Sequence, residues 1–274
     1  MIINKALTIA GSDSGGGAGI QADLKTFQEL GVFGMSALTA VTAQNTKGVQ
    51  GVYPMTAEAV VAQIQSIGED LVPDAVKTGM LFNAEIIEGV SREITRYQWK
   101  NVVIDPVMVA KGGASLLQKE AIAAMKEYLI PLSILITPNI PEAEVLTGLR
   151  IKTDQQKNEA ARKLHDMGAK NVMIKGGHDE AENDAVDLLF DGQRFYEFKS
   201  KRIQTVNTHG TGCTFSAAIT AGLAEGMTVS NAVERAKRFI QAAIEDDLQL
   251  GSGHGPTNHW AYNRRKKEIF VHGS

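Results

Sequence analysis

A glycine-rich segment in the last quarter of the chain carries the pattern with the clearest chemical meaning. Residues 209–214 read His-Gly-Thr-Gly-Cys-Thr and lead into small residues that are typical of a helix. A helix N-terminus offers free backbone N–H groups and a partial positive charge, and Gly210 and Gly212 would let an anion approach closely. The segment therefore predicts a phosphate cradle, although a glycine turn that only caps a buried helix fits the same pattern. It is not a Walker A loop, because no Gly-Lys-Ser/Thr follows.

Cys213 stands in the first turn of the helix that this cradle would begin. A thiol at that place is expected to ionise more easily than a free one, whose pKa is about 8.5. A lone cysteine is more often an inert, buried small side chain, but its position in the cradle favours a functional role. Because it is the chain's single cysteine, an intrachain disulfide is excluded.

Charged and amide side chains follow several of the apolar segments. Asp105 comes directly after one such segment, Asn139 and Glu142 follow the next, and Lys175 ends a third. Carboxylates suit a hydrated Mg²⁺, which takes one or two of them together with substrate phosphates, and a lysine can meet phosphate as a point charge. Each residue alone could be a helix cap or a solvated side chain, so their combination carries the prediction of a magnesium and phosphate site.

A second glycine-rich loop spans residues 12–19, between the first predicted strand and the first predicted helix. The dinucleotide-binding pattern fails there, because Ile20 stands where a third glycine is required after Gly15 and Gly17. Gln44 occupies the strand end where such a site would need an acidic residue. The loop therefore predicts closure over a small ligand rather than dinucleotide binding.

Short apolar segments alternate with amphipathic ones along nearly the whole chain, and these elements must position the residues above. Strands are predicted over residues 6–10, 37–43, 75–78, 102–104, 134–136, 172–174, 187–190 and 194–198. Helices are predicted over residues 21–30, 57–71, 86–97, 119–129, 154–168 and 229–246, with a capping box at Thr153 and Gln156.

This alternation predicts an α/β fold with a central, mostly parallel sheet and helices on both faces. Asp191-Gly192 is a hairpin turn and predicts a small antiparallel edge. In such sheets ligands bind outside the carboxyl ends of the strands, where the polar residues fall. With no linker or composition break, we expect a single domain over residues 1–262 and a basic, solvated tail over 263–274.

Composition excludes several classes of protein. The 274 residues include 28 Lys+Arg and 31 Asp+Glu, for a net charge of -3, which argues against a nucleic-acid-binding protein. No apolar stretch approaches the length of a membrane span, and no signal peptide is evident. We expect a soluble, cytoplasmic protein whose partners are small molecules.

Taken together, these motifs resemble the ribokinase-like superfamily over about residues 5–262, and most closely its bacterial hydroxymethylpyrimidine and phosphomethylpyrimidine kinases, with the vitamin B6 kinases nearby. The segments that carry the resemblance are residues 7–13, 19–25, 77–80, 105–108, 137–139, 142–143, 175–177, 209–214 and 255–256. The resemblance implies a ribokinase-like fold and transfer of the ATP γ-phosphate to the hydroxymethyl group of 4-amino-5-hydroxymethyl-2-methylpyrimidine, then to its monophosphate, in thiamine biosynthesis. It also implies a homodimer.

The resemblance also implies a role for individual residues. Gln44 matches the position that hydrogen-bonds the aminopyrimidine, for which an amide has the right donor and acceptor. Other positions match as follows: Gly11, Asp23, Met80 and Val107 the substrate pocket; Asn139, Lys175 and Thr211 the ATP side; Glu142 and Asp105 the magnesium; and Gly210, Gly212, Cys213 and Lys175 the catalytic group. The sequence leaves open whether a monovalent cation is also needed.

One position departs from the wider superfamily, whose sugar kinases usually have an aspartate base where this chain has Cys213. A loose phosphoryl-transfer transition state needs little base strength. Cys213 could then be a base, a hydrogen-bond partner, or a thiol that adds to an aldehyde substrate. An aldehyde would mean pyridoxal, so vitamin B6 kinase activity is the alternative, although residues 42–46 look more like the pyrimidine kinases. A third alternative is a nucleotide or vitamin sensor without turnover.

Overall fold

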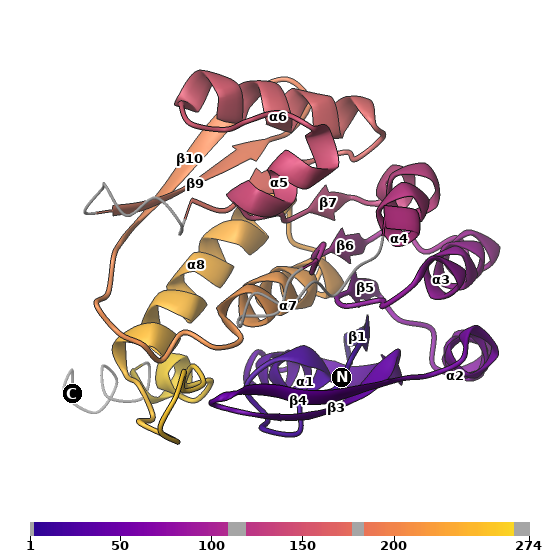
Figure 1. Ribbon diagram of the computed structural model, residues 1–274, viewed down its shortest axis with the longest axis horizontal. Helices are drawn as coiled ribbons and strands as arrows, with labels where there is room; N and C mark the ends of the chain where they lie inside the picture. The colour runs from indigo at the N-terminus through magenta and orange to yellow at the C-terminus, as the bar shows by residue number, and fades with distance from the viewer. Residues whose placement is uncertain (1–2, 109–118, 177–183, 266–274) are drawn as a thin grey trace.

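A single large sheet organises the computed structural model, which describes residues 3–108, 119–176 and 184–265 (Figure 1). The strands are β1 (Lys5–Ala10), β2 (Phe33–Leu38), β5 (Ala75–Thr78), β6 (Val102–Ile104), β7 (Leu135–Ile136), β8 (Val172–Ile174), β9 (Asp184–Phe190) and β10 (Phe195–Lys201). Their order is β10-β9-β8-β7-β6-β5-β1-β2. All pairs from β2 to β8 are parallel, whereas β8-β9 and β9-β10 are antiparallel. The predicted parallel sheet with an antiparallel edge is confirmed.

Helices cover both faces of this sheet, as predicted (Figure 1). One face packs against α1 (Gly19–Glu29), α7 (Thr211–Ala224) and α8 (Val229–Glu245). The other packs against α2 (Ala57–Asp70), α3 (Ala84–Arg96), α4 (Lys119–Ala124), α5 (Ile140–Thr147) and α6 (Asp154–Asp166). A π-helical turn, Met125–Leu129, and a 3-10 turn, Ile130–Leu132, continue α4. Neighbouring strand residues serve opposite faces, since Val102 and Ile104 join one core and Val103 the other.

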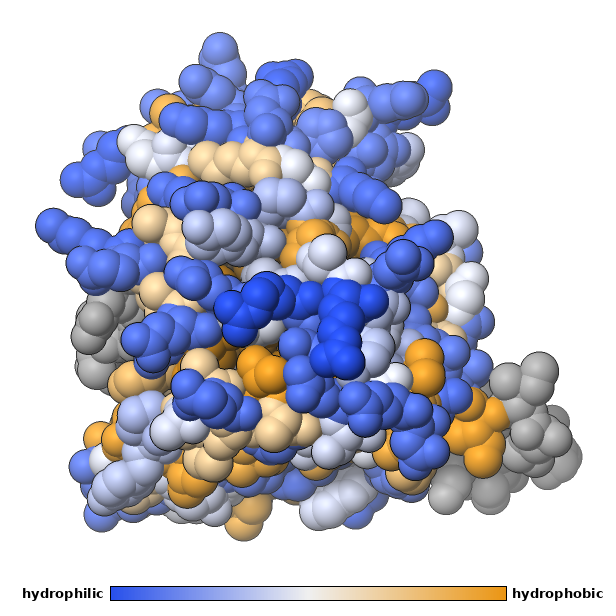
Figure 2. Space-filling model, turned by 90° about the vertical axis from the view of Figure 1, so that its right-hand side faces the viewer, coloured by the Kyte–Doolittle hydropathy of each residue, from blue (hydrophilic) through white to orange (hydrophobic). Residues whose placement is uncertain are grey.

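The outward faces of these helices are polar. Figure 2 views the molecule from the side of α2 and α3, where hydrophilic side chains dominate and apolar ones form small, separate groups. This surface follows from amphipathic helices that bury one stripe only, such as Ile86, Ile87, Val90 and Ile94 of α3. Within the part of the chain that the structure describes, no helix has the length and apolar character needed to span a membrane.

The strand predicted over residues 37–43 is wrong as one element, because the chain leaves the large sheet at Thr39. The Thr39 backbone N–H donates to the carbonyl of Ala10, and its hydroxyl donates to the carbonyl of Met80 at 2.6 Å. Beyond it, β3 (Ala40–Asn45) pairs antiparallel with β4 (Gly48–Pro54) in a separate two-stranded sheet. Sequence reasoning missed this hairpin because the apolar pattern runs through Thr39 without interruption.

Two predicted features, a helix cap and the C-terminal tail, take a different form in the structure. The Thr153 side chain accepts from the backbone N–H of Gln156, but the Gln156 side chain accepts from the backbone N–H of Lys152, one residue before the position that a capping box requires.

Near the C-terminus, Arg265 pairs with Glu245, and the guanidinium of Arg264 lies 5.4 Å from the Trp260 ring centre. The first residues of the predicted tail thus contact helices, and residues 266–274 lie outside the described part.

A buried ion pair ties the centre of the sheet to α1. Lys77 of β5 and Asp23 of α1 lie 2.8 Å apart, and both side chains are fully buried. The hydroxyl of Thr8 donates to the same carboxylate at 2.6 Å. Burial disfavours the Lys77 ammonium, but the charge and hydrogen bond of Asp23, together with the nearby Cys213 and Asp105, outweigh burial and keep the pKa of Lys77 above its usual range.

Removing one member of this pair leaves an uncompensated buried charge, so Asp23→Asn is expected to lower the free energy of unfolding by roughly 3–5 kcal/mol. Glu69→Gln, which breaks an exposed pair with Arg96 at 3.8 Å, is the matched control and should cost less than about 1 kcal/mol. Urea denaturation followed by circular dichroism measures both changes. Equal losses in the two variants would contradict a structural role for the buried pair.

Candidate active site

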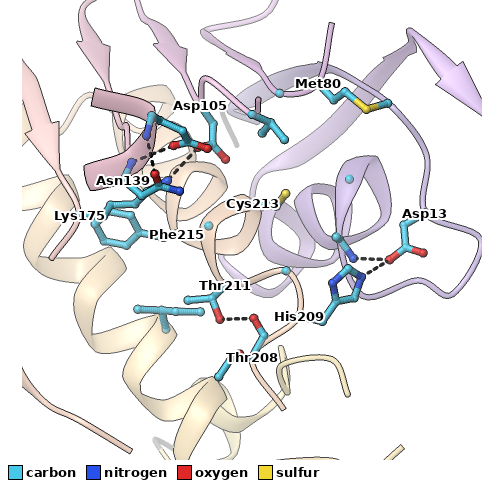
Figure 3. Close-up of a pocket in the computed structure, with 18 of the residues that line it drawn as sticks. Asp13, Met80, Asp105, Asn139, Lys175, Thr208, His209, Thr211, Cys213 and Phe215 are labelled. Carbon is cyan, nitrogen blue, oxygen red and sulfur yellow. Dashed lines mark hydrogen bonds and ion pairs between the residues drawn. The ribbon is translucent and has the colours of Figure 1, made fainter. Parts of the chain in front are cut away.

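The carboxyl ends of the parallel strands open onto one cleft of about 800 Å³. It brings together residues that the sequence predicted from eight separate segments, and several of them converge in Figure 3. Those that line it are Gly11, Gln44, Met80, Asp105, Val107, Asn139, Glu142, Lys175, Gly210, Thr211, Gly212 and Cys213. The predicted rim is therefore confirmed as a single concave surface.

Asp23 is the one predicted substrate residue that does not line the cleft. Its carboxylate is fully buried and turns toward Lys77 and Thr8. The inward face of α1 holds it against the sheet, so Asp23 supports the cleft wall from behind. Lys77, to which sequence reasoning gave no role, lines the cleft in its place.

The phosphate cradle has the backbone geometry that its glycines predict. Gly210, the N-cap of α7, has a φ of 81°, and a Cβ there would lie 1.7 Å from the carbonyl oxygen of Gly17. No side chain caps α7. The backbone N–H of Thr211 donates to the carbonyl of Thr208, so the N–H groups of Gly212 and Cys213 are the ones that an anion could meet. The hydroxyl of Thr211 donates to the carbonyl of Thr208 at 2.8 Å, which fixes the turn before the helix (Figure 3).

The thiol of Cys213 is neutral at physiological pH, contrary to the expectation from its helix position. Burial raises the pKa of Cys213 to about 11. The Lys77 ammonium acts in the opposite direction but does not outweigh burial, and the carboxylates of Asp23 and Asp105 reinforce the rise. The residue as a whole is half-buried, because it lies on the wall of the cleft. At neutral pH it is therefore a hydrogen-bond donor, and only a minute fraction is thiolate.

A cluster of three charged side chains lies on the far side of the cradle. Nζ of Lys175 lies 3.0 Å from Oδ1 of Asp105, whose other oxygen accepts from the hydroxyl of Ser216 at 3.2 Å. Although burial opposes both charges, Lys175 lowers the pKa of Asp105, and Asp105 together with Glu142 raises the pKa of Lys175. This pair is ionised and rigid.

Glu142 holds the third charge, at the start of α5. Asn139 and Glu142 form a complete capping box, in which each side chain accepts from the other residue's backbone N–H at 2.8 Å. Burial raises the pKa of Glu142 to about 7, and the neighbouring Asp105 adds to the rise although Lys175 opposes it. Too little positive charge surrounds the Glu142 carboxyl to keep its pKa at the ordinary value.

These carboxyls fit Mg²⁺, which binds through one or two of them, several waters and substrate phosphates. Across residues 3–108, 119–176 and 184–265, no group of three side chains forms a ready metal cage. Glu142 is the better ligand of the two, because Asp105 is already neutralised by Lys175. A divalent cation beside Glu142 would lower its pKa and supply the missing positive charge.

Local backbone features aim Gln44 into the cleft. The β3-β4 register shifts between Ala43 and Gln44, and such a bulge redirects the side chain that follows it. The hydroxyl of Ser14 donates to the carbonyl of Gln44 and accepts from its backbone N–H, at 2.9 and 2.8 Å. Gln44 is therefore fastened to the second glycine loop.

The opposite end of the cleft consists of residues that sequence reasoning missed. Phe215, Ile240 and Ile244 form an apolar wall there, beside an ion pair of Asp187 and Lys237 at 2.8 Å. These residues come from β9, α7 and α8, and no local motif connects them. His209 was also missed as a functional residue, although it directly precedes Gly210.

A cleft that joins an anion cradle to an amide-lined apolar slot at the carboxyl ends of an α/β sheet is typical of proteins that bind small, phosphate-bearing molecules. A sequence profile of the family described as phosphomethylpyrimidine kinase matches residues 13–258. The chain therefore belongs to the phosphomethylpyrimidine kinase family, which confirms the resemblance seen in the sequence.

Individual relatives agree with this assignment. The hydroxymethylpyrimidine/phosphomethylpyrimidine kinase of Bacillus subtilis is 60% identical over 264 residues, which cover 96% of this chain and 97% of that protein. The pyridoxine kinase of the same organism is 49% identical, over 95% of this chain and 97% of that one. The pyridoxal kinase of Staphylococcus aureus, solved in complex with AMP-PCP and pyridoxal, has a TM-score of 0.87 and is 40% identical, over 96% of each chain.

The raised pKa of Cys213 predicts slow alkylation at neutral pH. With the pKa of Cys213 raised to about 11, against about 8.5 for a free thiol, the thiolate fraction at pH 7.5 is roughly 300-fold lower than for a free thiol. Iodoacetamide should modify the folded protein correspondingly slowly, with a rate that rises tenfold per pH unit. Mass spectrometry gives the rate without ambiguity, because the chain has one cysteine. A rate at pH 7.5 that matches glutathione would contradict a raised pKa.

Glu142 predicts a pH-dependent stability of the metal-free protein. Its pKa is raised from 4.5 to about 7 on folding. The contribution of Glu142 to the free energy of unfolding is therefore fully present below about pH 4.5 and is lost as the pH rises through about 7. Glu142→Gln removes this loss. At pH 8 its free energy of unfolding, measured by urea denaturation, should therefore exceed that of the wild type by at most about 3 kcal/mol. Mg²⁺ should stabilise the wild type more than the variant at pH 8. An identical pH dependence in both proteins would refute the assignment.

Proposed function

We propose that this protein transfers the γ-phosphate of ATP to the hydroxymethyl group of 4-amino-5-hydroxymethyl-2-methylpyrimidine and then phosphorylates the monophosphate to the diphosphate. One observation carries the proposal: Gln44, the cradle of Gly210 and Gly212, and the Asp105–Lys175 pair all line the same cleft. An amide that can read a pyrimidine edge thus shares a cavity with groups that can hold phosphates.

The substrate end of the cleft suits a flat, methylated ring. Met80 and Val107 line it, and a Cβ on Gly11 would lie 2.4 Å from the terminal methyl of Met80. Glycine at position 11 therefore leaves room for the Met80 side chain to pack along the slot. The ring would lie between these apolar groups while the Gln44 amide pairs with its polar edge.

The chain's own groups would then act mainly by position and charge. Backbone N–H groups at the start of α7 hold the transferring phosphoryl group. The Lys175 ammonium, which Asp105 holds at 3.0 Å, lies beside Gly212 of the cradle as a point charge. The neutral Cys213 thiol lies where the attacking hydroxyl must approach and donates or accepts a hydrogen bond to orient it. Mg²⁺ held by Glu142 would neutralise the nucleotide phosphates.

Phosphorylation of vitamin B6 is the second candidate function, and two observations favour it. The 49% identical relative is named pyridoxine kinase, and Cys213 faces the cleft that would receive an aldehyde. Addition would form a bond between sulfur and the carbonyl carbon, with the thiol proton passing to the carbonyl oxygen. The homodimer and the cytoplasmic location stay predictions of the sequence.

The purified protein should convert the pyrimidine to its mono- and diphosphate in the presence of Mg²⁺-ATP, as measured by mass spectrometry. Gln44→Ala should raise the KM for the pyrimidine roughly 10–100-fold and change the KM for ATP less than about threefold, because it removes a paired donor and acceptor. Gln50→Ala, an exposed amide on β4 whose side chain donates to the carbonyl of Gly48, is the matched control. Phosphorylation of pyridoxal without any phosphorylation of the pyrimidine would favour the second candidate function, vitamin B6 phosphorylation.

Cys213→Ala in the same assay should lower kcat by about 10–100-fold and leave ATP affinity nearly unchanged, since the thiol touches the acceptor side of the reaction. Cys213→Ser keeps a hydrogen-bonding group and should retain more activity. Wild-type turnover in Cys213→Ala would limit the thiol to a packing role.

A further inference from the structure

A hydrogen-bonded chain of three side chains connects the two glycine loops at the substrate end of the cleft. Oδ2 of Asp13 lies 2.8 Å from Nε2 of His209, and the amide nitrogen of Gln44 lies 3.1 Å from the same ring nitrogen. Figure 3 shows the Asp13 carboxylate and the His209 ring facing each other at the edge of the pocket. The mechanism above gives no role to Asp13 or to His209.

Asp13 is an ionised hydrogen-bond acceptor. Its two oxygens accept from the backbone N–H groups of Gly15, Gly17 and Ala18 at 2.8–3.0 Å. Burial opposes its ionisation, but the hydrogen bond and the charge of His209, with the backbone N–H groups, outweigh burial and lower the pKa of Asp13. A carboxylate in this state can only accept.

The ring nitrogen that faces Asp13 must therefore carry a hydrogen. This holds for the neutral ring protonated on Nε2 and for the imidazolium alike. A group that shares this hydrogen must also be an acceptor. The amide nitrogen of Gln44 is itself a donor, so at 3.1 Å from this N–H two donors would face each other. A half-turn of the amide, which exchanges its nitrogen and oxygen, brings an acceptor to His209 instead.

The other side of the Gln44 amide leads independently to the same orientation. The Thr42 hydroxyl donates its single hydrogen to the carbonyl of Ser12 at 2.8 Å. It lies 3.4 Å from Oε1 of Gln44, at the end of the amide that faces away from His209. With its hydrogen engaged, the hydroxyl offers that end only lone pairs, which an NH₂ group can satisfy and an oxygen cannot.

We propose that Asp13 and His209 are positioning residues that lock the Gln44 amide with its oxygen toward His209 and its NH₂ group toward Thr42. One lone pair and one hydrogen then remain for the ligand, in a fixed order. This order matches the edge of a 4-aminopyrimidine, whose amino group donates beside a ring nitrogen that accepts. It opposes a 4-oxopyrimidine, whose edge has the reverse order. The inference rests on the proposed function and assigns the source of its specificity.

The test compares kcat/KM for 4-amino-5-hydroxymethyl-2-methylpyrimidine with that for its 4-oxo counterpart. The wild type should favour the amino compound about 1,000-fold, as expected for a site that leaves the wrong edge unpaired. His209→Ala frees the amide to rotate, so the preference should fall at least tenfold, through KM and not kcat. His209→Gln restores an N–H near the place of Nε2 and should recover most of the preference. His254→Ala, at an exposed histidine beside the carbonyl of Val206, should leave it unchanged.

A preference that stays within twofold of the wild type in His209→Ala overturns the inference. A second measurement does not depend on turnover: a long-range ¹H–¹⁵N spectrum should place a hydrogen on Nε2 of His209. A hydrogen on Nδ1 alone would overturn the lock even if the pyrimidine is phosphorylated. If the wild type phosphorylates pyridoxal only, the proposed function fails, and the spectrum still decides the orientation of the amide.

Discussion

The contact between the two glycine loops is the constraint on which the site depends. At the closest point a Cβ on Gly210 would lie 1.7 Å from the carbonyl oxygen of Gly17, and one on Gly17 would lie 2.7 Å from the His209 ring. Only backbone without side chains can pass so closely. The loop after β1 reaches the end of the cleft where Gln44 lies, and α7 begins at the glycine cradle. Their contact therefore sets the distance between Gln44 and the cradle.

Electrostatics divides the same cleft into two regions. Around Cys213, burial keeps the thiol neutral even though the Lys77 ammonium acts on it. Around Asp105 and Lys175, the ion pair is balanced and Glu142 is left without a matching cation. A neutral region beside one that is short of positive charge suits the proposed reaction, in which charge is concentrated on the phosphate donor. Positioning and charge neutralisation then carry more of the catalysis than a strong base would.

The parts of the fold that the sequence predicted well are those set by local pattern. Strands 75–78 and 102–104 were predicted to the residue, because short apolar runs end there at Gly79 and Asp105. The break at Thr39 depends on hydrogen bonds to Ala10 and Met80, far away in the chain, so no local pattern marks it. The glycine cradle was predictable because its geometry demands glycine at position 210.

Predictions about the site failed where tertiary environment reverses a local preference. The N-terminus of α7 should favour a Cys213 thiolate, but burial against the sheet costs more than the helix gains and raises the pKa to about 11. The family resemblance assigned Asp23 to the substrate pocket, yet the packing of α1 turns its carboxylate to Lys77. The Asp13–His209 contact joins residues 196 positions apart, and its meaning depends on a third side chain.

The hydrogen-bond chain at Gln44 shows why an amide serves as the reader here. A carboxylate at this place could accept from His209 but could give nothing to a ring nitrogen, and a lysine could only donate. An amide does both, but its two ends can exchange by rotation, so it discriminates only when a fixed donor on one side and a fixed acceptor on the other hold it. The donor is His209, whose N–H is held by Asp13, and the acceptor is Thr42, whose own hydroxyl hydrogen is donated to the carbonyl of Ser12. Both Asp13 and Ser12 belong to the second glycine loop, which thus orients the amide that reads the substrate as well as enclosing the cleft.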